Sequence, residues 1–173
     1  MKRKARPVEE VGMTELMYGR KVSKNSPRVR AYGTVDELNS VLGLVRIHSV
    51  DTKACSVVLG AQERLFRLMT ELAVDSADRE RLKRGPVLLL GDADREWIQA
   101  AIEAWSSGID GGMTWVLPGE KPAQAYLDLG RTVCRRAERE VVALAEAGEP
   151  VRLELIGFLN DLSYLLWLME RSA

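Results

Sequence analysis

Histidine and cysteine are scarce in this chain. Its 173 residues include one histidine, His48, and two cysteines, Cys55 and Cys134. A metal site built from several histidines is therefore excluded, and nucleophilic catalysis that depends on histidine is disfavoured. The two cysteines are too far apart for a metal or redox motif, so we expect buried thiols in a reducing compartment, the cytoplasm.

The chain also lacks an excess of either charge and any long apolar run. Lys plus Arg number 25 and Asp plus Glu number 25, so composition points to neither nucleic acid nor an anionic membrane as a partner. No segment approaches the roughly 18 apolar residues of a membrane span. The basic start, residues 1–6, is not followed by the apolar stretch of a secretory signal. We expect one domain, 1–173.

What the sequence does contain is helical periodicity. Apolar residues recur every three or four positions in five segments, 34–49, 52–74, 92–107, 121–147 and 150–171. No strand-rich region is evident. The predicted fold class is therefore all-α, a five-helix up-and-down bundle that is ferritin-like in general appearance.

Helix boundaries are predicted from capping residues. Thr34, with a glutamate three residues later, predicts the start of the first helix. Asp92 or Asp94 is expected to cap the third helix. Gly148 is expected to end the fourth, and Pro150 suits the first turn of the fifth.

The segments between the helices show no sustained period. Residues 1–31 contain several glycine, asparagine and proline breaks, which predict an irregular N-terminal loop. The charged segment 75–85 predicts an exposed loop. Residues 114–119 predict an extended segment before the fourth helix.

Arginines are concentrated on the fourth predicted helix, at Arg131, Arg135, Arg136 and Arg139. Guanidinium groups stay charged and bind two oxygens at once, which suits a polyphosphate. The alternative is a solvated face with pairs within the helix, for example to Glu138. For Arg131 a structural role that bridges helices is equally open.

Three segments in this order and spacing resemble the PduO-type ATP:cob(I)alamin adenosyltransferases: residues 28–40, 131–139 and 157–164. Residues 62–66 and 115–119 fit the same family, and the similarity covers about residue 12 to the C-terminus. The resemblance implies a five-helix bundle that assembles as a homotrimer, with ATP between neighbouring subunits. It also implies transfer of the 5′-deoxyadenosyl group of ATP to cob(I)alamin, giving adenosylcobalamin and triphosphate.

Site residues follow from the resemblance, position by position. Catalytic roles are implied for Arg135 and Asp36. The implied ATP-binding residues are Gly12, Thr14, Lys24, Arg135, Arg136, Glu138, Arg139 and Asn160. The implied corrinoid-binding residues are Tyr32, Asp36, Trp115 and Tyr164. Asp36 would pair with a motif arginine, although its charge also suits a helix N-terminus. Trp115 stands where the family has an aromatic that closes the lower face of the corrin.

The resemblance also implies the small molecules and partners. These are ATP with Mg²⁺, cobalamin as substrate, a flavoprotein reductase and an adenosylcobalamin-dependent enzyme. We expect no metal ligand from protein side chains, no nucleic acid and no membrane. Cob(I)alamin is itself a strong nucleophile, so the reaction needs no general base and the scarcity of histidine is no obstacle.

The sequence departs from the family pattern at four places. Residues 8–11 replace a glycine-containing run of the loop, and Asp128 replaces a histidine. Asp161 replaces an arginine, and Tyr164 replaces an aspartate. These changes leave an alternative open, a non-catalytic relative that binds nucleotide or corrinoid for delivery or sensing.

Overall fold

Six α-helices dominate the computed structural model, which describes residues 10–107 and 117–172. The helices are α1 Pro27–His48, α2 Thr52–Leu72, α3 Arg79–Lys83, α4 Asp92–Ser106, α5 Pro122–Glu146 and α6 Leu153–Ser172. Two short strands, β1 Met13–Glu15 and β2 Lys21–Ser23, and two 3₁₀ turns, Met17–Gly19 and Ser76–Asp78, complete the described elements. The prediction of an all-α chain is confirmed.

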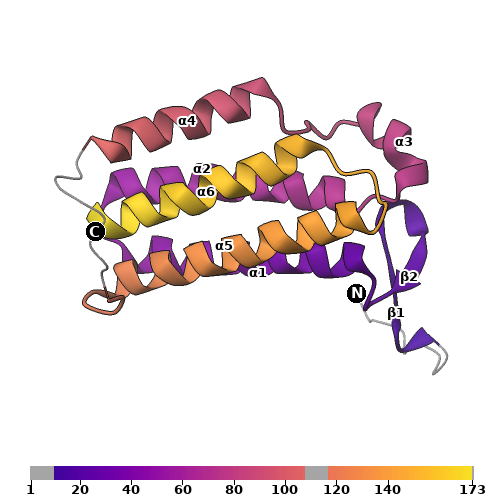
Figure 1. Ribbon diagram of the computed structural model, residues 1–173, viewed down its shortest axis with the longest axis horizontal. Coiled ribbons are helices and arrows are strands. Elements are labelled where there is room, and N and C mark those ends of the chain that lie inside the picture. Colours follow the sequence, from indigo (N-terminus) through magenta and orange to yellow (C-terminus); the bar gives the residue numbers. More distant parts are fainter. Residues whose placement is uncertain (1–9, 108–116, 173) are drawn as a thin grey trace.

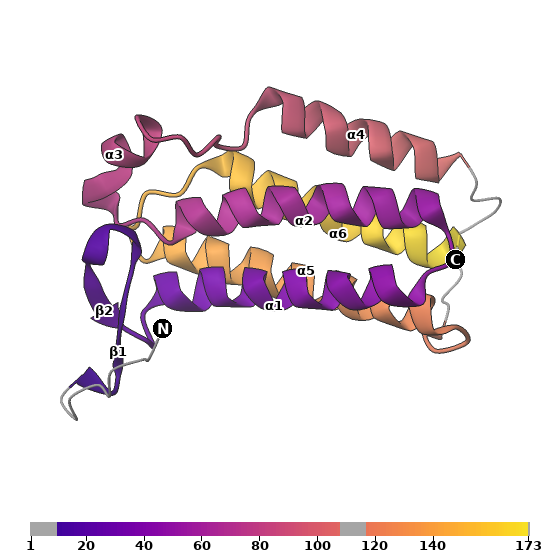
Figure 2. The ribbon, with the colours of Figure 1, turned by 180° about the vertical axis from the view of Figure 1, so that it is seen from behind.

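The five long helices lie side by side, and successive ones run in opposite directions along the molecule (Figure 1). Helix α1 packs against α2 and α5, α5 packs against α6, and α6 packs against α4. Seen from behind, α2 lies in front of α6 (Figure 2). Helices α5 and α6, which carry two of the three family-like segments, are therefore direct neighbours.

The core consists of the apolar faces that periodicity predicted. Because residues three and four apart share one helix face, each long helix buries a continuous stripe. In α1, α5 and α6 the following apolar residues recur at helical spacing and are all buried: Val35, Leu38, Leu42, Val45, Val133, Cys134, Ala137, Val141, Leu144, Leu155, Leu159, Leu162, Leu166 and Met169. Cys55 is only half-buried, so the prediction of two buried thiols is right for Cys134 alone.

The first helix begins earlier than predicted. Ser26 is its N-cap, and the Ser26 hydroxyl accepts a hydrogen bond from the Val29 N–H at 3.4 Å. Pro27 follows at the first helical position, where its missing N–H costs nothing. Thr34 lies inside α1 and donates its hydroxyl to the Arg30 carbonyl at 2.9 Å, so the prediction of Thr34 as the cap is wrong.

Two other boundary predictions need correction. Helix α4 is capped at Gly91, although the Asp94 carboxylate accepts the Gly91 N–H at 3.0 Å. Helix α6 begins at Leu153, so Pro150 precedes it and does not lie in its first turn. The prediction for Gly148 is confirmed, because its φ of 86° is the left-handed conformation that ends a helix such as α5.

The predicted loops contain more structure than expected. Between residues 10 and 26 the chain forms an antiparallel hairpin, with Thr14 opposite Val22, and α1 follows from Pro27. The segment 75–85 forms a 3₁₀ turn and α3, and it buries Leu82. A segment too short to show an apolar repeat can thus still form a helix when one of its apolar side chains is buried. The extended segment expected at 114–119 is described only from residue 117, so Trp115 lies outside the described residues. Residues 8 and 9, part of the departure at residues 8–11, also lie outside them.

Candidate functional site

A pocket of about 390 Å³ lies between α5 and α6. Arg131 and Arg135 line it from α5, because residues four apart share a helix face. The face of α6 that meets them carries polar and aromatic side chains: Asn160, Ser163, Tyr164 and Trp167. Two positive charges, an amide, two hydroxyl groups and an indole therefore meet in one cavity.

The motif arginines differ in what holds them. Arg131 donates twice to Asp128 one turn earlier, at 2.9 and 2.7 Å. Arg136 points to the other side of α5 and pairs with Glu37 of α1 at 2.5 Å. Among the described residues, neither Arg135 nor Arg139 forms an ion pair within 4 Å. Arg135 is thus the one cation of the pocket whose charge no carboxylate offsets.

The α6 wall of the pocket is ordered by local contacts. The Ser163 hydroxyl donates to the Asn160 carbonyl at 2.8 Å. Tyr164 and Trp167 stack with ring centroids 5.7 Å apart and planes 17° from parallel. These rings offer a flat apolar surface beside the two guanidinium groups, which is suited to a planar ring that carries an anion.

Buried groups support the pocket from behind. The Cys134 thiol donates to the Leu159 carbonyl at 3.2 Å and links α5 to α6. Burial raises the pKa of Cys134, so the thiol stays protonated. Burial, with a contribution from Asp128, also raises the pKa of Glu170, while Arg131 acts in the opposite direction. Arg131 therefore faces two carboxyl groups, whereas Arg135 faces the open pocket.

A larger cavity of about 440 Å³ lies between α4 and α6. Its rim carries Asp92, Glu154 and Asp161 against the single exposed cation Arg95. Like charges would repel a triphosphate there, so the smaller pocket with the two arginines is the better anion site despite its size. Asp161, the departure from the family arginine, faces α4 and accepts from Gln99 at 2.8 Å.

The predicted residues of the N-terminal segment lie on the hairpin. The Lys24 N–H donates to the Gly12 carbonyl at 2.9 Å, and Thr14 lies in β1. The Lys24 side chain is exposed. Glu10 pairs with Lys21 at 2.5 Å, so this carboxylate is offset before any anion arrives. In the described part of the chain, no cluster of three or more His, Cys, Asp or Glu side chains could hold a metal ion.

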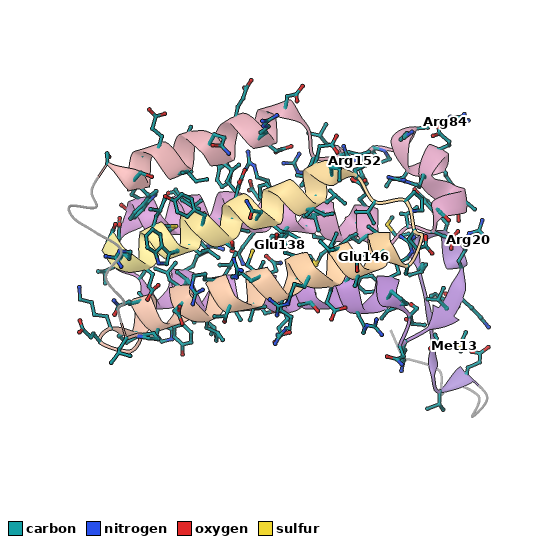
Figure 3. The ribbon with its side chains drawn as sticks, viewed as in Figure 1. Met13, Arg20, Arg84, Glu138, Glu146 and Arg152 are labelled. Atoms are coloured by element: carbon teal, nitrogen blue, oxygen red, sulfur yellow. The ribbon has the colours of Figure 1, made fainter. Side chains whose placement is uncertain are left out.

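The structure does not bring the two halves of the predicted nucleotide site together within one chain. Met13 of the hairpin lies beyond the end of the helices, whereas Glu138 lies in the middle of α5 (Figure 3). Glu138 and Arg139 belong to the same helix as Arg135 but do not line its pocket. Asn160, in contrast, lines the same pocket as Arg135, and its role in ATP binding stays a prediction.

The predicted corrinoid residues are also distributed. Tyr32 and Asp36 lie one turn apart on α1, and Asp36 is exposed. Within the described chain Asp36 forms no ion pair with an arginine, and its neighbour Glu37 pairs with Arg136 instead. Tyr164 lies on α6 in the arginine pocket. The corrinoid assignments therefore remain predictions.

Sequence reasoning underestimated two pocket residues. Trp167 was given no role in the site, and Arg131 was left open between two roles, yet both line the pocket. The signal was present in the spacing, because positions 160, 163, 164 and 167 form one face of α6 without an aliphatic side chain.

The fold and the pocket define a class, a mainly helical protein with an arginine-lined pocket between two antiparallel helices. The chain belongs to the cobalamin adenosyltransferase family, whose model matches residues 9–173. None of the helices that the structure describes is long and apolar enough to cross a bilayer.

Individual relatives agree with this assignment. The chain is 34% identical to the corrinoid adenosyltransferase PduO of Salmonella typhimurium over 94% of its own length and 47% of the relative's. It is 33% identical to a corrinoid adenosyltransferase of Citrobacter freundii, over 92% of this chain and 88% of that one. The chain thus spans about half the length of the PduO proteins that it matches.

Solved structures show the same fold. A variant PduO-type ATP:corrinoid adenosyltransferase from Lactobacillus reuteri, complexed with cobalamin and ATP, superposes with a TM-score of 0.83 at 28% identity. The match covers 95% of this chain and 89% of that one. An arginine-to-lysine variant of the Lactobacillus reuteri enzyme, complexed with ATP, gives a TM-score of 0.80 at 27% identity.

Proposed function

We propose that this protein is an ATP:cob(I)alamin adenosyltransferase, which transfers the 5′-deoxyadenosyl group of ATP to cob(I)alamin. The observation that carries the proposal is the pocket in which Arg131 and Arg135 meet Asn160. Family membership and the solved relatives with cobalamin and ATP support the same substrates. Mg²⁺ would arrive with the triphosphate as part of the substrate, since the described residues offer no cluster of metal ligands.

The reaction suits these residues. The electron pair of Co(I) attacks C5′ of ATP, a cobalt–carbon bond forms, and the C5′–O bond breaks with its electrons leaving on triphosphate. The protein has no proton to remove, so it needs only to orient C5′ over cobalt and to stabilise the departing charge. Arg135 would perform the second task, and its exposed side chain, which forms no ion pair in the described chain, supports this role.

We further propose that the ATP site is completed between subunits of a homotrimer. Met13, which lies between Gly12 and Thr14 in the hairpin, is beyond the end of the helices, whereas Glu138, one turn from Arg135, is in the middle of α5 (Figure 3). A hairpin from a neighbouring subunit would supply the missing half. Arg136, Glu138 and Arg139 would then bind at the edge of the shared site.

The corrinoid side is proposed to involve Tyr32, Asp36, Trp115 and Tyr164. Asp36 is exposed and has no arginine partner in the described chain, so it is available to an arginine of a neighbouring subunit. Trp115 would act as a wedge that keeps a ligand from the lower face of cobalt. A flavoprotein reductase would supply the electron, and an adenosylcobalamin-dependent enzyme would receive the product.

The finer architecture and location are part of the same proposal. The five long helices would form a five-helix up-and-down bundle of ferritin-like appearance, with α3 as an accessory turn. A cytoplasmic location fits a reaction that needs a strongly reduced substrate and a chain whose described cysteines are free.

A second candidate is a non-catalytic relative that binds nucleotide or corrinoid. Asp161 and Tyr164 favour it, because they replace an arginine and an aspartate of the family pattern. Asp161 is turned toward Gln99 of α4, however, and Tyr164 keeps a polar group in the pocket. Both observations weaken the argument for the non-catalytic candidate.

The deciding experiment supplies cob(I)alamin directly, with ATP and Mg²⁺, and follows its spectrum. We expect conversion to adenosylcobalamin by the wild-type chain. Arg135→Ala should lower kcat/KM by about 100-fold, as expected when one donor to a developing anion is removed. ATP binding without any spectral change would favour the second candidate instead.

The matched control is Arg84→Ala. Arg84 is also an exposed arginine, but it lies beside α3 at one end of the molecule, whereas Glu138, one turn from Arg135, lies in the middle of α5 (Figure 3). Its loss should leave the rate within about twofold of the wild type, since a screened surface charge contributes little at a distance. Equal losses in both variants would argue against a specific role for Arg135.

A further inference from the structure

The turn of the N-terminal hairpin is attached to the segment that connects α2 to α3. Leu16 at the start of the turn is 4% exposed. The Met17 N–H donates to the Ala73 carbonyl, just beyond α2, at 2.9 Å. In both ribbon views the hairpin lies beside α3 at one end of the molecule (Figures 1 and 2).

Arg20 holds the turn to the same segment through charge. Its Nε donates to Asp78, and Asp75 lies 3.7 Å from the same nitrogen. The hydrogen bond from Arg20 is the main reason that the pKa of Asp78 lies below its ordinary value. The Asp78 carboxylate therefore keeps its charge at neutral pH, and its link to Arg20 persists there.

Tyr18 adds a second attachment. Its φ of 67° is the left-handed conformation, which is unfavourable for a bulky side chain. The Arg81 guanidinium of α3 lies over its ring, 4.1 Å from the centroid. A strained backbone persists only where surrounding contacts stabilise it, and the contact of Tyr18 with Arg81 of α3 is one such contact.

The supporting segment is itself fixed to the helices. Arg28, buried at the start of α1, donates to the carbonyls of Leu72 and Val74 at 3.1 and 2.7 Å. Leu82 of α3 is 2% exposed. The segment between α2 and α3 is thus fixed to the helices, and the position of the hairpin depends on the contacts of its turn with this segment.

We infer that Arg20 is a positioning residue for the nucleotide, acting through its ion pair with Asp78. Away from the turn, the hairpin is held by its own strand pairing, by the pair of Lys21 with Glu10 and by the start of α1, and none of these contacts involves the segment between α2 and α3. Arg20 therefore sets the angle at which Gly12 and Lys24 present themselves to ATP. The inference rests on the proposed function.

The test compares kinetic constants for the two substrates. Arg20→Gln and Asp78→Asn should each raise KM for ATP by about five- to tenfold, because a misplaced loop loses oriented contacts. The value of kcat should stay within about twofold, and KM for cob(I)alamin should not change. The charge-exchanged double variant, Arg20→Asp with Asp78→Arg, should recover most of the loss.

Lys83→Gln is the matched control. It breaks an exposed pair of α3 with Glu80, 2.7 Å long, that does not touch the hairpin. Its KM for ATP should equal that of the wild type. A similar rise of KM in Lys83→Gln would mean that any charge change near α3 has this effect, and would overturn the inference.

Amide hydrogen exchange without substrates provides a second measurement. Arg20→Gln should speed exchange at Met17 and Lys24 at least fivefold and leave α5 unchanged. Unchanged exchange, or an unchanged KM in an active enzyme, would overturn the inference while the proposed function stands. A wild-type chain that does not convert cob(I)alamin would overturn both, and that result is distinguishable because it concerns the unmodified protein.

Discussion

Arginine serves two opposite purposes in this chain, and its surroundings decide which. Arg28 is 7% exposed and donates hydrogen bonds to two carbonyls and to Glu149, so its guanidinium is occupied by contacts within the fold. Arg135 is exposed and forms no ion pair among the described residues. A guanidinium that is already satisfied has little left for a ligand, so of these two arginines only Arg135 is available for binding.

Gly60 of α2 shows how tightly one residue can be constrained. A Cβ at this position would lie 2.7 Å from Cζ2 of Trp97, whose ring is covered by the Arg64 guanidinium at 3.8 Å. We expect Gly60→Ala to lower the free energy of unfolding by about 1–3 kcal/mol, because overpacking outweighs the gain in helix propensity. Denaturant unfolding would measure it.

The control is Gly157→Ala in α6, where no atom lies within 4 Å of the added Cβ. This variant should gain about 0.5–1 kcal/mol from the lower flexibility of the unfolded chain. Two glycine replacements inside helices are therefore expected to act in opposite directions. A gain in stability for Gly60→Ala would show that Trp97 moves aside freely.

Glu170 predicts a dependence of stability on pH. Burial is the first cause that raises its pKa above the ordinary value of 4.5, and Asp128 adds to it. Folding therefore favours the neutral form, and this stabilisation is present below the unfolded-state pKa and lost as pH rises through the folded-state pKa. Glu170→Gln should raise Tm at pH 7 and lose that advantage near pH 4. Equal Tm values for both proteins at pH 7 would contradict this.

At the level of elements, charged side chains join the ends of helices that also share the apolar core. Glu71 near the end of α2 accepts from Arg152, just before α6, at 2.7 and 2.8 Å. Arg152 also donates to the Leu90 carbonyl at 2.9 Å, in the segment before α4. One partly buried ion pair therefore holds the ends of three elements together.

We expect Arg152→Met to lower the free energy of unfolding by about 3 kcal/mol, because Glu71 would stay buried with only Arg79 at 3.7 Å. Thermal and denaturant unfolding would measure the loss. The double variant Glu71→Gln with Arg152→Met should recover part of it, since no charge is then left unpaired. If the double variant loses as much as the sum of the two single ones, the pair is not coupled.

For the whole molecule, the separation of the hairpin from the arginine pocket leads to a test of shared sites. Lys24→Ala and Arg135→Ala chains should each be nearly inactive alone. Mixed by refolding together, they should regain about a quarter of the wild-type rate, because each mixed ring of three contains one intact site. The spectral assay of adenosylcobalamin formation would measure this recovery.

The control mixes Arg135→Ala with Asn160→Ala. Both residues line the same pocket of one chain, so no mixed assembly contains an intact site. Recovery is therefore expected for the first mixture and not for the second. Failure of the first mixture, with trimers confirmed by light scattering, would place the hairpin and the pocket of one chain in the same site.

The helices could be predicted from sequence because each depends on a local pattern. The seam of Leu155, Leu159 and Leu162 repeats at helical spacing, and all three residues are buried. Helix starts were less predictable. Thr34 is a residue type common at N-caps, but the helix already begins at Pro27, with Ser26 as its N-cap. The hairpin and α3 were missed, because they depend on contacts with distant residues such as Ala73.

The sequence by itself determined the helical class, the buried faces, the arginine cluster and the resemblance to one family, because all of these are properties of residue type and spacing. The tertiary structure alone decided which arginines remain available. Glu149 pairs with Arg28 and Glu37 pairs with Arg136, each from another part of the fold, whereas nothing in the described chain pairs with Arg135. The physical reason is that an ion pair depends on distances of a few ångströms between elements far apart in sequence, and only folding sets those distances.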